Sequence, residues 1–179
     1  MVQNKKECFI ISQECPDDIN GIREVNLAAF TGPGEASLVE GLRQACSNFV
    51  SLVAKIGCQV VGHILFTPVR IETPAGDCIE GMGLGPMAVL PEYQNKGIGS
   101  ALCKTGLKTI EQRGVSYVVV LGHPSYYPRF GFKPASAYGI TCAYQDVPND
   151  AFMMRVFDSA VLSGVQGVAH YRKEFDQVS

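Results

Sequence analysis

The sequence of 179 residues predicts an α/β (α+β) fold around a mixed, mainly antiparallel sheet. Two β-rich runs, Phe49–Ile56 and Gln59–Phe66, are separated only by Gly57-Cys58, which indicates a hairpin of antiparallel strands. Further along, an apolar strand that ends at Leu90 is followed by a helix-period segment and then by the β-branched run Tyr117–Leu121. A strand–helix–strand unit of this length predicts a crossover between two parallel strands.

The composition is typical of one globular domain, residues 1–179, and it excludes several classes of protein. A hydrophobic fraction of 46% with a charged fraction of 18% supports a substantial buried core. The formal charge of -2 gives no basic face, so we expect no nucleic-acid partner. No apolar run approaches the roughly 20 residues that span a bilayer, and the N-terminus has no signal-type apolar segment. We therefore expect no membrane contact.

The seven cysteines indicate a reducing compartment. Their number is odd, and none of them forms a C-x-x-C pair. Cys58 and Cys103 lie in apolar runs, as buried free thiols do in the cytoplasm. The sequence therefore predicts a cytoplasmic protein, with a bacterial-type enzyme as the first hypothesis.

The N-terminal third predicts one short strand and two helices. The strand covers Cys8–Ser12, and Pro16-Asp17-Asp18 then supplies a helix start with acidic residues in the first turn. The helical stripe breaks at 31–34, and a second helix is predicted over Glu35–Ala45. By analogy, two paired helices in this position form one wall of a binding cleft.

The remaining strands are predicted at both sides of a glycine-rich region. Val69–Glu72 extends the second hairpin strand beyond Pro68, and the return strand is Cys78–Leu90. Within that return strand, Pro86 cannot donate a ladder hydrogen bond, so it predicts a bulge or an unpaired edge. Two further strands, Phe152–Phe157 and Gly167–Phe175, are expected to add to the edge of the sheet.

The stretch Met82–Ser100 carries the clearest chemistry. An apolar strand reaches a loop in which Gln94, Gly97 and Gly99 have the spacing Q-x-x-G-x-G, and an amphipathic helix follows at once. The start of a helix leaves backbone N–H groups unpaired at the positive end of the helix dipole. Glycines at that point let a ligand approach the backbone. These features predict an anion site suited to phosphates.

This stretch, with the motif YYPRFGF that follows the buried VVV strand, resembles the GNAT superfamily of acetyl-CoA-dependent N-acetyltransferases. The resemblance is densest from Leu84 to Pro134 and rests on PEYQNKGIG together with Tyr127 and Gly131-Phe132. One departure is Asn95, where the family often has glycine; asparagine tolerates left-handed backbone better than most residues. The resemblance implies a sheet with a splayed parallel pair of strands and helices on both faces.

The resemblance also implies the residues that bind the coenzyme. Backbone groups of the strand Met87, Ala88 and Val89 are expected to pair with the pantetheine arm and to face the thioester carbonyl. The loop that is expected to hold the diphosphate comprises Gln94, Asn95, Lys96, Gly97, Ile98, Gly99 and Ser100. The co-substrate is acetyl-CoA, and no metal is expected.

Two catalytic roles are assigned in the same way. Tyr127 matches the family tyrosine whose hydroxyl assists departure of the thiolate, while its neighbour Tyr126 is expected to pack inward and Arg129 to lie at the surface. Glu80 is the first candidate for the base that deprotonates the amine, directly or through water. His63 and His123 are the alternatives for the base.

The sequence therefore predicts an N-acetyltransferase that transfers an acetyl group to a primary amine by direct attack in a ternary complex. The acceptor is a small molecule or a peptide, and homodimerisation is left open. One alternative is an acyl-CoA-binding sensor or regulatory module without turnover. A weaker alternative is a hydrolase that uses the thiol of Cys142 or Cys103.

Overall fold

The computed structural model describes residues 8–178, which contain one continuous sheet of nine strands. In chain order the strands are β1 (Ile10–Gln13), β2 (Val50–Ile56), β3 (Gln59–Glu72), β4 (Cys78–Val89), β5 (Tyr117–Leu121), β6 (Lys133–Pro134), β7 (Ile140–Cys142), β8 (Phe152–Val156) and β9 (Gly167–His170). In the sheet they lie in the order β1-β2-β3-β4-β5-β8-β6, while β9 pairs with β3 and β7. The antiparallel hairpin β2–β3 and the parallel pair β4–β5 are both confirmed.

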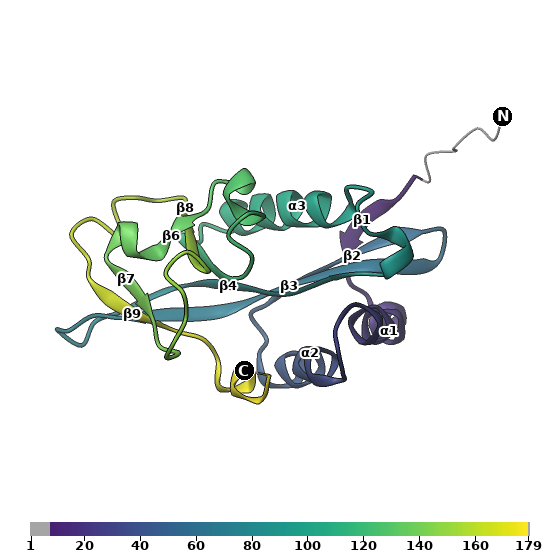
Figure 1. The fold of residues 1–179 in the computed structure, drawn as a ribbon, viewed down its shortest axis with the longest axis horizontal. Helices are drawn as coiled ribbons and strands as arrows, with labels where there is room; N and C mark the ends of the chain where they lie inside the picture. Colours follow the sequence, from purple (N-terminus) through teal and green to yellow (C-terminus); the bar gives the residue numbers. More distant parts are fainter. Residues whose placement is uncertain (1–7, 179) are drawn as a thin grey trace.

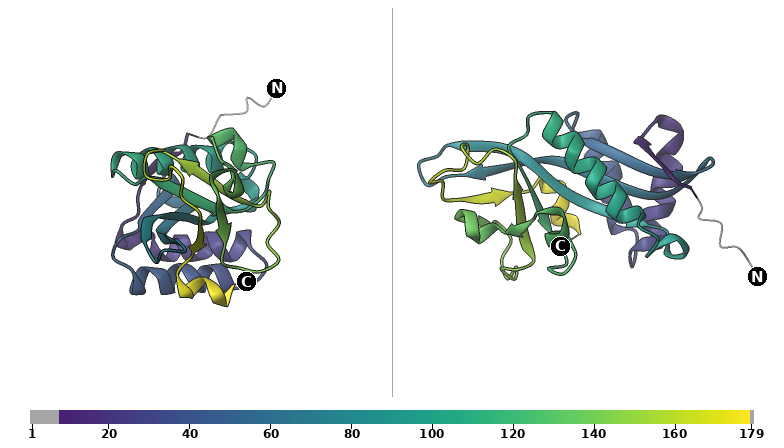
Figure 2. Two further views of the ribbon diagram at one scale, coloured as in Figure 1. Left: turned by 90° about the vertical axis from the view of Figure 1, so that its left-hand side faces the viewer. Right: turned by 90° about the horizontal axis from the view of Figure 1, so that it is seen from above.

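Helices cover both faces of the sheet, as predicted. They are α1 (Ile19–Ala29), α2 (Gly34–Ala45) and α3 (Ile98–Gln112). Figure 1 shows α1 and α2 on one face and α3 on the opposite face. Seen from above in Figure 2, α3 crosses the strands diagonally. Of the helices within residues 8–178, none combines the length and apolar character needed to span a membrane.

The start of α1 explains why the chain turns at Pro16. The side chain of Asp18 accepts a hydrogen bond from the backbone N–H of Cys15 at 3.0 Å, and it pairs with Lys55 of β2 at 2.6 Å. Burial opposes ionisation of this carboxyl, but the hydrogen bonds from Lys55 and Cys15 together with the charge of Lys55 outweigh it, and the pKa of Asp18 is lowered. The pair therefore joins the helix start to the sheet.

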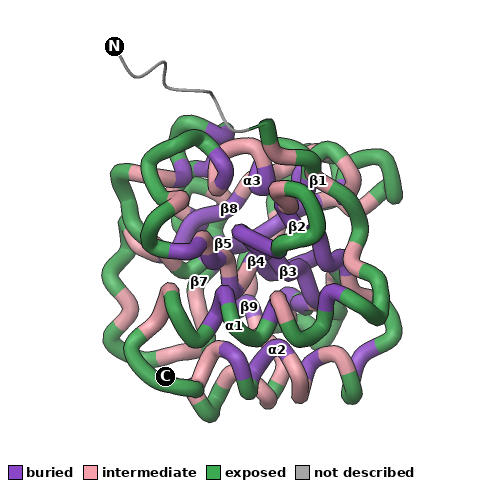
Figure 3. The backbone as a smooth tube through the Cα atoms, turned by 90° about the vertical axis from the view of Figure 1, so that its right-hand side faces the viewer, coloured by how far each residue is buried: buried purple, intermediate pink, exposed green. Residues whose placement is uncertain are grey.

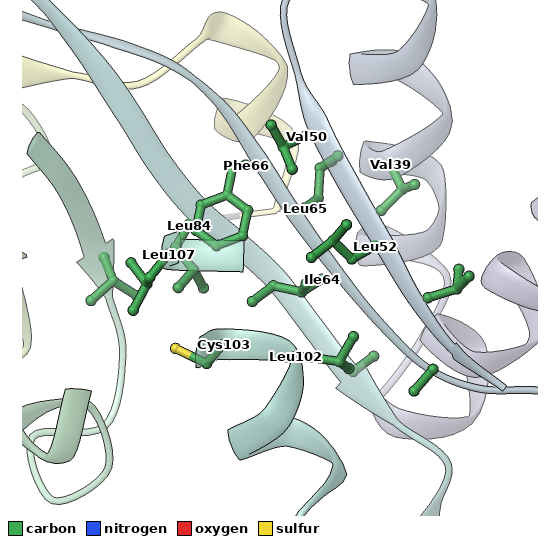
Figure 4. Packing of buried hydrophobic residues seen from close by; sticks show 14 of the residues in the cluster. Val39, Val50, Leu52, Ile64, Leu65, Phe66, Leu84, Leu102, Cys103 and Leu107 are labelled. Atoms are coloured by element: carbon green, nitrogen blue, oxygen red, sulfur yellow. The ribbon is translucent and has the colours of Figure 1, made fainter. Parts of the chain in front are cut away.

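The core lies between the sheet and the helices on each side. In Figure 3 the strands form the buried interior, and the outer turns of the helices are exposed. Figure 4 shows Leu102 and Cys103 of α3 facing the strands. A Cβ at Gly106 would lie 2.3 Å from the ring of Phe66, so this glycine lets α3 approach β3 closely. Side chains along a strand alternate between the two faces of the sheet. The residues directly before and after Phe66 on β3 therefore face α1 and α2.

A bulge in β4 separates this strand from β5. On the β3 side, Leu84 pairs with Phe66 and Met87 with Ile64, so Gly85 and Pro86 together oppose one residue. This confirms the predicted irregularity at Pro86. On the other side β4 pairs with β5 only as far as Leu84, which lies opposite Val120. Beyond that point the two parallel strands diverge.

Two local predictions were wrong. The strand predicted over Gly167–Phe175 ends at His170, and a 3-10 helix over Lys173–Gln177 follows. Cys58 is exposed in the hairpin turn, whereas Cys103 is buried as expected. The predicted extension of the second hairpin strand beyond Pro68 is confirmed, because β3 continues to Glu72 with Pro68 opposite Met82.

A buried polar network joins α1 and α2 to the strands, and His63 lies at its centre. The ring of His63 is fully buried, with Nδ1 at 3.2 Å from Asn26 Nδ2 and Nε2 at 3.0 Å from Ser51 Oγ. Ser51 donates to Glu14, which also accepts two hydrogen bonds from Arg43 at 2.8 and 3.0 Å. Because the Asn26 amide nitrogen can only donate, Nδ1 is an acceptor and Nε2 carries the proton of a neutral imidazole.

Burial lowers the pKa of His63 to about 4, and Glu14 only partly offsets it. The unfolded chain, with an ordinary pKa of 6.5, therefore takes up a proton at a higher pH than the folded protein does. We expect the free energy of unfolding to fall by about 3 kcal/mol as the pH drops through this interval. Burial opposes ionisation of Glu14, but the hydrogen bonds from Arg43 and Ser51 and the nearby charges lower its pKa, so its own contribution to stability is lost as the pH falls below 4.5.

Chemical denaturation at a series of pH values measures this contribution. A His63→Gln variant is expected to be less stable near neutral pH but to lose the steep fall. His123→Gln, at an exposed position, serves as the control and should keep it. If the His63→Gln profile ran parallel to that of the wild type over the interval, the network would not be responsible.

Candidate functional site

A cleft of about 770 Å³ lies where β4 leaves β5. Residues of α2 and the C-terminal segment line one half of it, and residues around the start of α3 line the other. Since α2 and α3 cover opposite faces of the sheet, the cleft crosses the sheet through the opening between the two strands. We call the two parts the α2 half (Phe30, Glu35, Leu38, Phe175 and Val178) and the α3 half (Met87, Val89, Tyr93, Gln94, Asn95, Gly97, Ile98, Gly99, Ser100, His123, Tyr126, Tyr127 and Arg129).

The loop before α3 forms an exposed helix start in the α3 half. Asn95 and Gly97 adopt left-handed backbone, with φ of 59° and 86°. Gly97 is the N-cap residue, and no side chain caps the helix. The first intrahelical bond runs from the N–H of Ala101 to the carbonyl of Gly97 at 3.0 Å. The N–H groups of the first turn of α3 are therefore available to an anion.

Contacts on either side fix this loop against β4. Gln94 donates its side-chain N–H to the carbonyl of Val89 at 3.0 Å. A Cβ at Gly99 would lie 3.0 Å from the hydroxyl of Tyr126, so the glycine keeps the mouth of the helix open. Tyr126 is half-buried and lines the cleft, which corrects the expectation that it simply packs inward. Its hydroxyl faces the helix start.

Most of the residues expected to bind the coenzyme are brought together. Met87, Val89 and the loop residues Gln94, Asn95, Gly97, Ile98, Gly99 and Ser100 all line the cleft. Two do not. Ala88 is buried on the strand, in register with His63, and Lys96 lies 5.0 Å from the centre of the Tyr93 ring outside the cleft.

Tyr127 lies on the cleft wall with its ring buried. The side chain is 8% exposed and packs edge-on against Tyr126 and Phe132. A Cβ at Gly122 would lie 2.4 Å from this ring, so the turn after β5 needs glycine for the tyrosine to reach its place. Burial raises the pKa of Tyr127 above the usual value of 10, with smaller effects from Cys103 and Tyr126. The phenol is therefore protonated at neutral pH.

Glu80 lies apart from this cleft. It is exposed on β4 opposite Arg70, and it lines a second, charged hollow of about 540 Å³. Tyr144 and Tyr171 line both hollows and stand between them. The structure thus places Tyr127 in the same cleft as the loop before α3, and Glu80 on the other side of these two rings.

Burial decides which of the histidine candidates for the base, and which of the cysteine candidates for a nucleophile, could act in the cleft. His63 is enclosed in the polar network and does not line the cleft, whereas His123 does. Burial raises the pKa of the Cys103 thiol to about 12 and also raises that of Cys142. A catalytic thiol needs a lowered pKa. The hydrolase alternative is therefore disfavoured.

Several polar residues of the cleft wall were not predicted from the sequence. Arg129, expected only at the surface, lies 4.7 Å from the centre of the Tyr126 ring and adds a cation to the α3 half. Glu35 lines the α2 half. Tyr144 and Tyr171 come from irregular C-terminal segments that no periodic pattern points to. The buried hydroxyl of Tyr171 makes no hydrogen bond of normal geometry, although the nearby backbone of Leu121 acts on its pKa.

Among residues 8–178, no group of three or more His, Cys, Asp or Glu side chains is arranged to hold a metal ion.

In comparisons with known proteins, most of the chain is similar to acetyltransferases. The family model described as an acetyltransferase (GNAT) domain matches residues 12–135. The uncharacterized N-acetyltransferase YhbS of Escherichia coli K12 is 32% identical over 170 residues, which cover 94% of this chain and 99% of the relative. YjhQ, from the same strain and named in the same way, is 40% identical over 121 residues, 66% of each chain.

Two solved structures share both fold and sequence with this chain. One is YhbS of Escherichia coli in complex with CoA, with a TM-score of 0.87, 30% identity, and coverage of 96% of this chain and 93% of the other. The second is a GNAT family acetyltransferase of Brucella melitensis in complex with acetyl-CoA. It has a TM-score of 0.76, 34% identity, and coverage of 95% and 99%.

The uncapped start of α3 leads to a prediction for Gly99→Glu. The new side chain would crowd the Tyr126 hydroxyl and place a negative charge where an anion is expected. Coenzyme A binding, measured by calorimetry, should be lost. Gly41→Glu is the matched control, because Gly41 lies in α2 with open space around it and outside the cleft. Unchanged coenzyme affinity in folded Gly99→Glu protein would show that this loop does not bind it.

A second prediction concerns Lys96, which the structure places over Tyr93 rather than in the cleft. If backbone amides hold the diphosphate, Lys96→Ala should weaken coenzyme A binding by no more than about 1 kcal/mol, the scale of an exposed charge pair. Calorimetry under the same conditions measures this. A loss many-fold larger would mean that the side chain, and not the backbone, is the main anion contact.

Proposed function

The chain belongs to the GNAT family of acetyltransferases, and we propose on this premise that it transfers an acetyl group from acetyl-CoA to a primary amine. One observation carries the proposal: the uncapped start of α3 and the diverging strands β4 and β5 open into the same cleft. An anion site alone would suit many phosphate ligands. Combined with an open strand edge, it suits a ligand that has a diphosphate and an extended amide-bearing arm.

The α3 half fits coenzyme A. The N–H groups at the start of α3 would hold the diphosphate, with Arg129 as a nearby cation. The pairing of β4 with β5 ends at Leu84, so backbone groups around Met87, and those of Val89 other than the carbonyl that Gln94 occupies, are candidates to pair with the pantetheine arm. The two related structures, which were solved in complex with CoA and acetyl-CoA, support coenzyme A as the ligand.

The thioester supplies an acyl group that a neutral amine can attack. In the proposed reaction the amine nitrogen forms a bond to the carbonyl carbon, the C–S bond breaks, and the coenzyme leaves as a thiolate. The backbone N–H groups of β4 next to the bulge are candidates to stabilise the negative charge on the carbonyl oxygen. An alkylammonium, with a pKa of about 10.4, must lose one proton before it can attack, and the nitrogen loses a second proton once the C–N bond has formed, which gives the neutral amide.

Tyr127 is proposed to stabilise the departing thiolate. Its hydroxyl makes no hydrogen bond with any residue in the described range, and its raised pKa keeps it protonated. The weak acidity of this phenol also limits the role of Tyr127 in catalysis. Because a thiol has a pKa near about 8.5, complete transfer of the phenol proton to the thiolate would be uphill. The hydroxyl therefore acts as a hydrogen-bond donor more than as a source of the proton.

The proton acceptor for the amine remains a choice between Glu80 and His123. Glu80 lies in the second hollow, so it would act only through water. His123 lines the cleft itself. An acyl-CoA-binding sensor without turnover would need neither residue. Release of free thiol from acetyl-CoA in the presence of a panel of amines tests the proposal, and coenzyme binding without release by any amine would favour the sensor.

The role of Tyr127 gives a prediction for Tyr127→Phe. The substitution keeps the ring and its packing but removes the hydroxyl, so stability and coenzyme affinity should hardly change. Turnover should fall by roughly 10- to 1000-fold, because the hydrogen bond to the thiolate is made mainly in the transition state. Initial rates with any accepted amine measure this.

Two further variants separate this role from packing. Tyr126→Phe removes the neighbouring hydroxyl, which faces Gly99, and should change the KM for acetyl-CoA more than turnover. Tyr127→Ala should damage folding as well as rate. Full turnover in Tyr127→Phe, with damage only in Tyr127→Ala, would mean that the residue is purely structural.

A further inference from the structure

The α2 half of the cleft has a different chemistry from the α3 half. Phe30, Leu38, Phe175 and Val178 give it an apolar wall. Among the residues that the structure describes, Glu35 is the one carboxylate that lines the cleft, and the cation Arg129 is in the other half. The cleft is thus divided between an anion-binding end and an apolar end with one negative charge.

Local packing holds Glu35 at this position. It lies in the first turn of α2, directly after Gly34, and a Cβ at Gly34 would lie 3.0 Å from the side chain of Val178. Phe175 in turn approaches Gly85 at the bulge of β4, where a Cβ would be 3.8 Å from its ring. The C-terminal segment therefore bridges the start of α2 and the point at which β4 leaves β5. This places Glu35 at the approach to the reaction centre.

The carboxylate of Glu35 is available to a ligand. The residue is half-buried, and it makes no hydrogen bond or ion pair with any residue in the described range. Other acidic residues of the same region are paired: Glu40 of α2 lies 2.6 Å from Arg23, and Glu14 binds Arg43. A half-buried carboxylate beside apolar side chains attracts a cation more strongly than one in water does.

We propose that Glu35 binds the ammonium group of the acceptor, and that the acceptor is a small primary amine with an apolar aliphatic or aromatic body. This rests on the acetyltransferase function proposed above. The apolar wall matches the body of such an amine, and the single carboxylate matches its single charge. Polyamines and amino sugars carry several charged or polar groups that this wall leaves unpaired. An amino acid would bring a carboxylate, and none of the described residues that line the α2 half is a cation to meet it.

Steady-state kinetics with acetyl-CoA tests the acceptor class. The probes are n-hexylamine and phenethylamine as apolar amines, compared with spermidine and L-lysine. The wild-type protein is expected to prefer the apolar amines in kcat/KM. In Glu35→Gln their KM should rise about 10- to 100-fold, the range for a lost charge-assisted hydrogen bond. The KM for acetyl-CoA should remain unchanged, and kcat should change by only a few-fold.

Matched variants exclude a general effect of charge or folding. Glu40→Gln removes a carboxylate from the same helix outside the cleft and should leave every KM as in the wild type. Glu35→Asp keeps the charge on a shorter side chain and should restore part of the affinity. Added salt should raise the KM for phenethylamine in the wild type but not in Glu35→Gln.

Binding of phenethylamine in the presence of coenzyme A, measured by calorimetry, tests the site without turnover. Weaker binding to Glu35→Gln than to Glu40→Gln supports the inference even if no amine is acetylated, an outcome that would count against the proposed function alone. Equal binding to the two variants overturns it. A wild-type preference for spermidine or L-lysine over phenethylamine, in kcat/KM or in binding, also overturns the inference.

Discussion

The divergence of β4 from β5 after Leu84 is the constraint on which the cleft depends. The bulge at Gly85 and Pro86 lets β4 keep its antiparallel pairing with β3 while it moves away from β5. Met87 returns to register with Ile64 on one side and faces the opening on the other. Backbone groups along such an opening need hydrogen-bond partners; Gln94 supplies one to the carbonyl of Val89, and water or a ligand can supply the others. A binding site is therefore built into the way in which the sheet is paired.

The two halves of the cleft depend on different parts of the chain for their position. The α3 half follows directly from the loop that ends β4, so its geometry is local in sequence. The α2 half depends on how α1 and α2 dock, and the network around His63 fixes this by linking Asn26 of α1 and Arg43 of α2 to the strands. Protonation of a buried imidazole would disturb that network first. The polar core of the protein therefore bears on the shape of its cleft.

The sequence predictions succeeded where a feature depends on neighbouring residues and failed where it depends on the docking of distant segments. The hairpin, the crossover and the loop from Gln94 to Ser100 were predictable because each depends on residues close together in the chain. Glu35 and Tyr171 gave no signal, since they meet the cleft only through the docking of α2 and of the C-terminal segment. From the sequence alone, His63 could not be distinguished from a catalytic base. Its burial beside Ser51 is a property of side chains that the fold brings together.

The neighbouring residues Tyr126 and Tyr127 indicate how one short turn can serve two purposes. The 3-10 helix Tyr127–Phe130 points successive rings in different directions, so that one hydroxyl faces the start of α3 and the other ring is enclosed beside Gly122. Enclosure raises the pKa of Tyr127, which makes the phenol a persistent donor but a weak acid. In the proposed reaction such a phenol would stabilise the departing thiolate through a hydrogen bond and not by transfer of its proton, because the thiol is the stronger acid of the two.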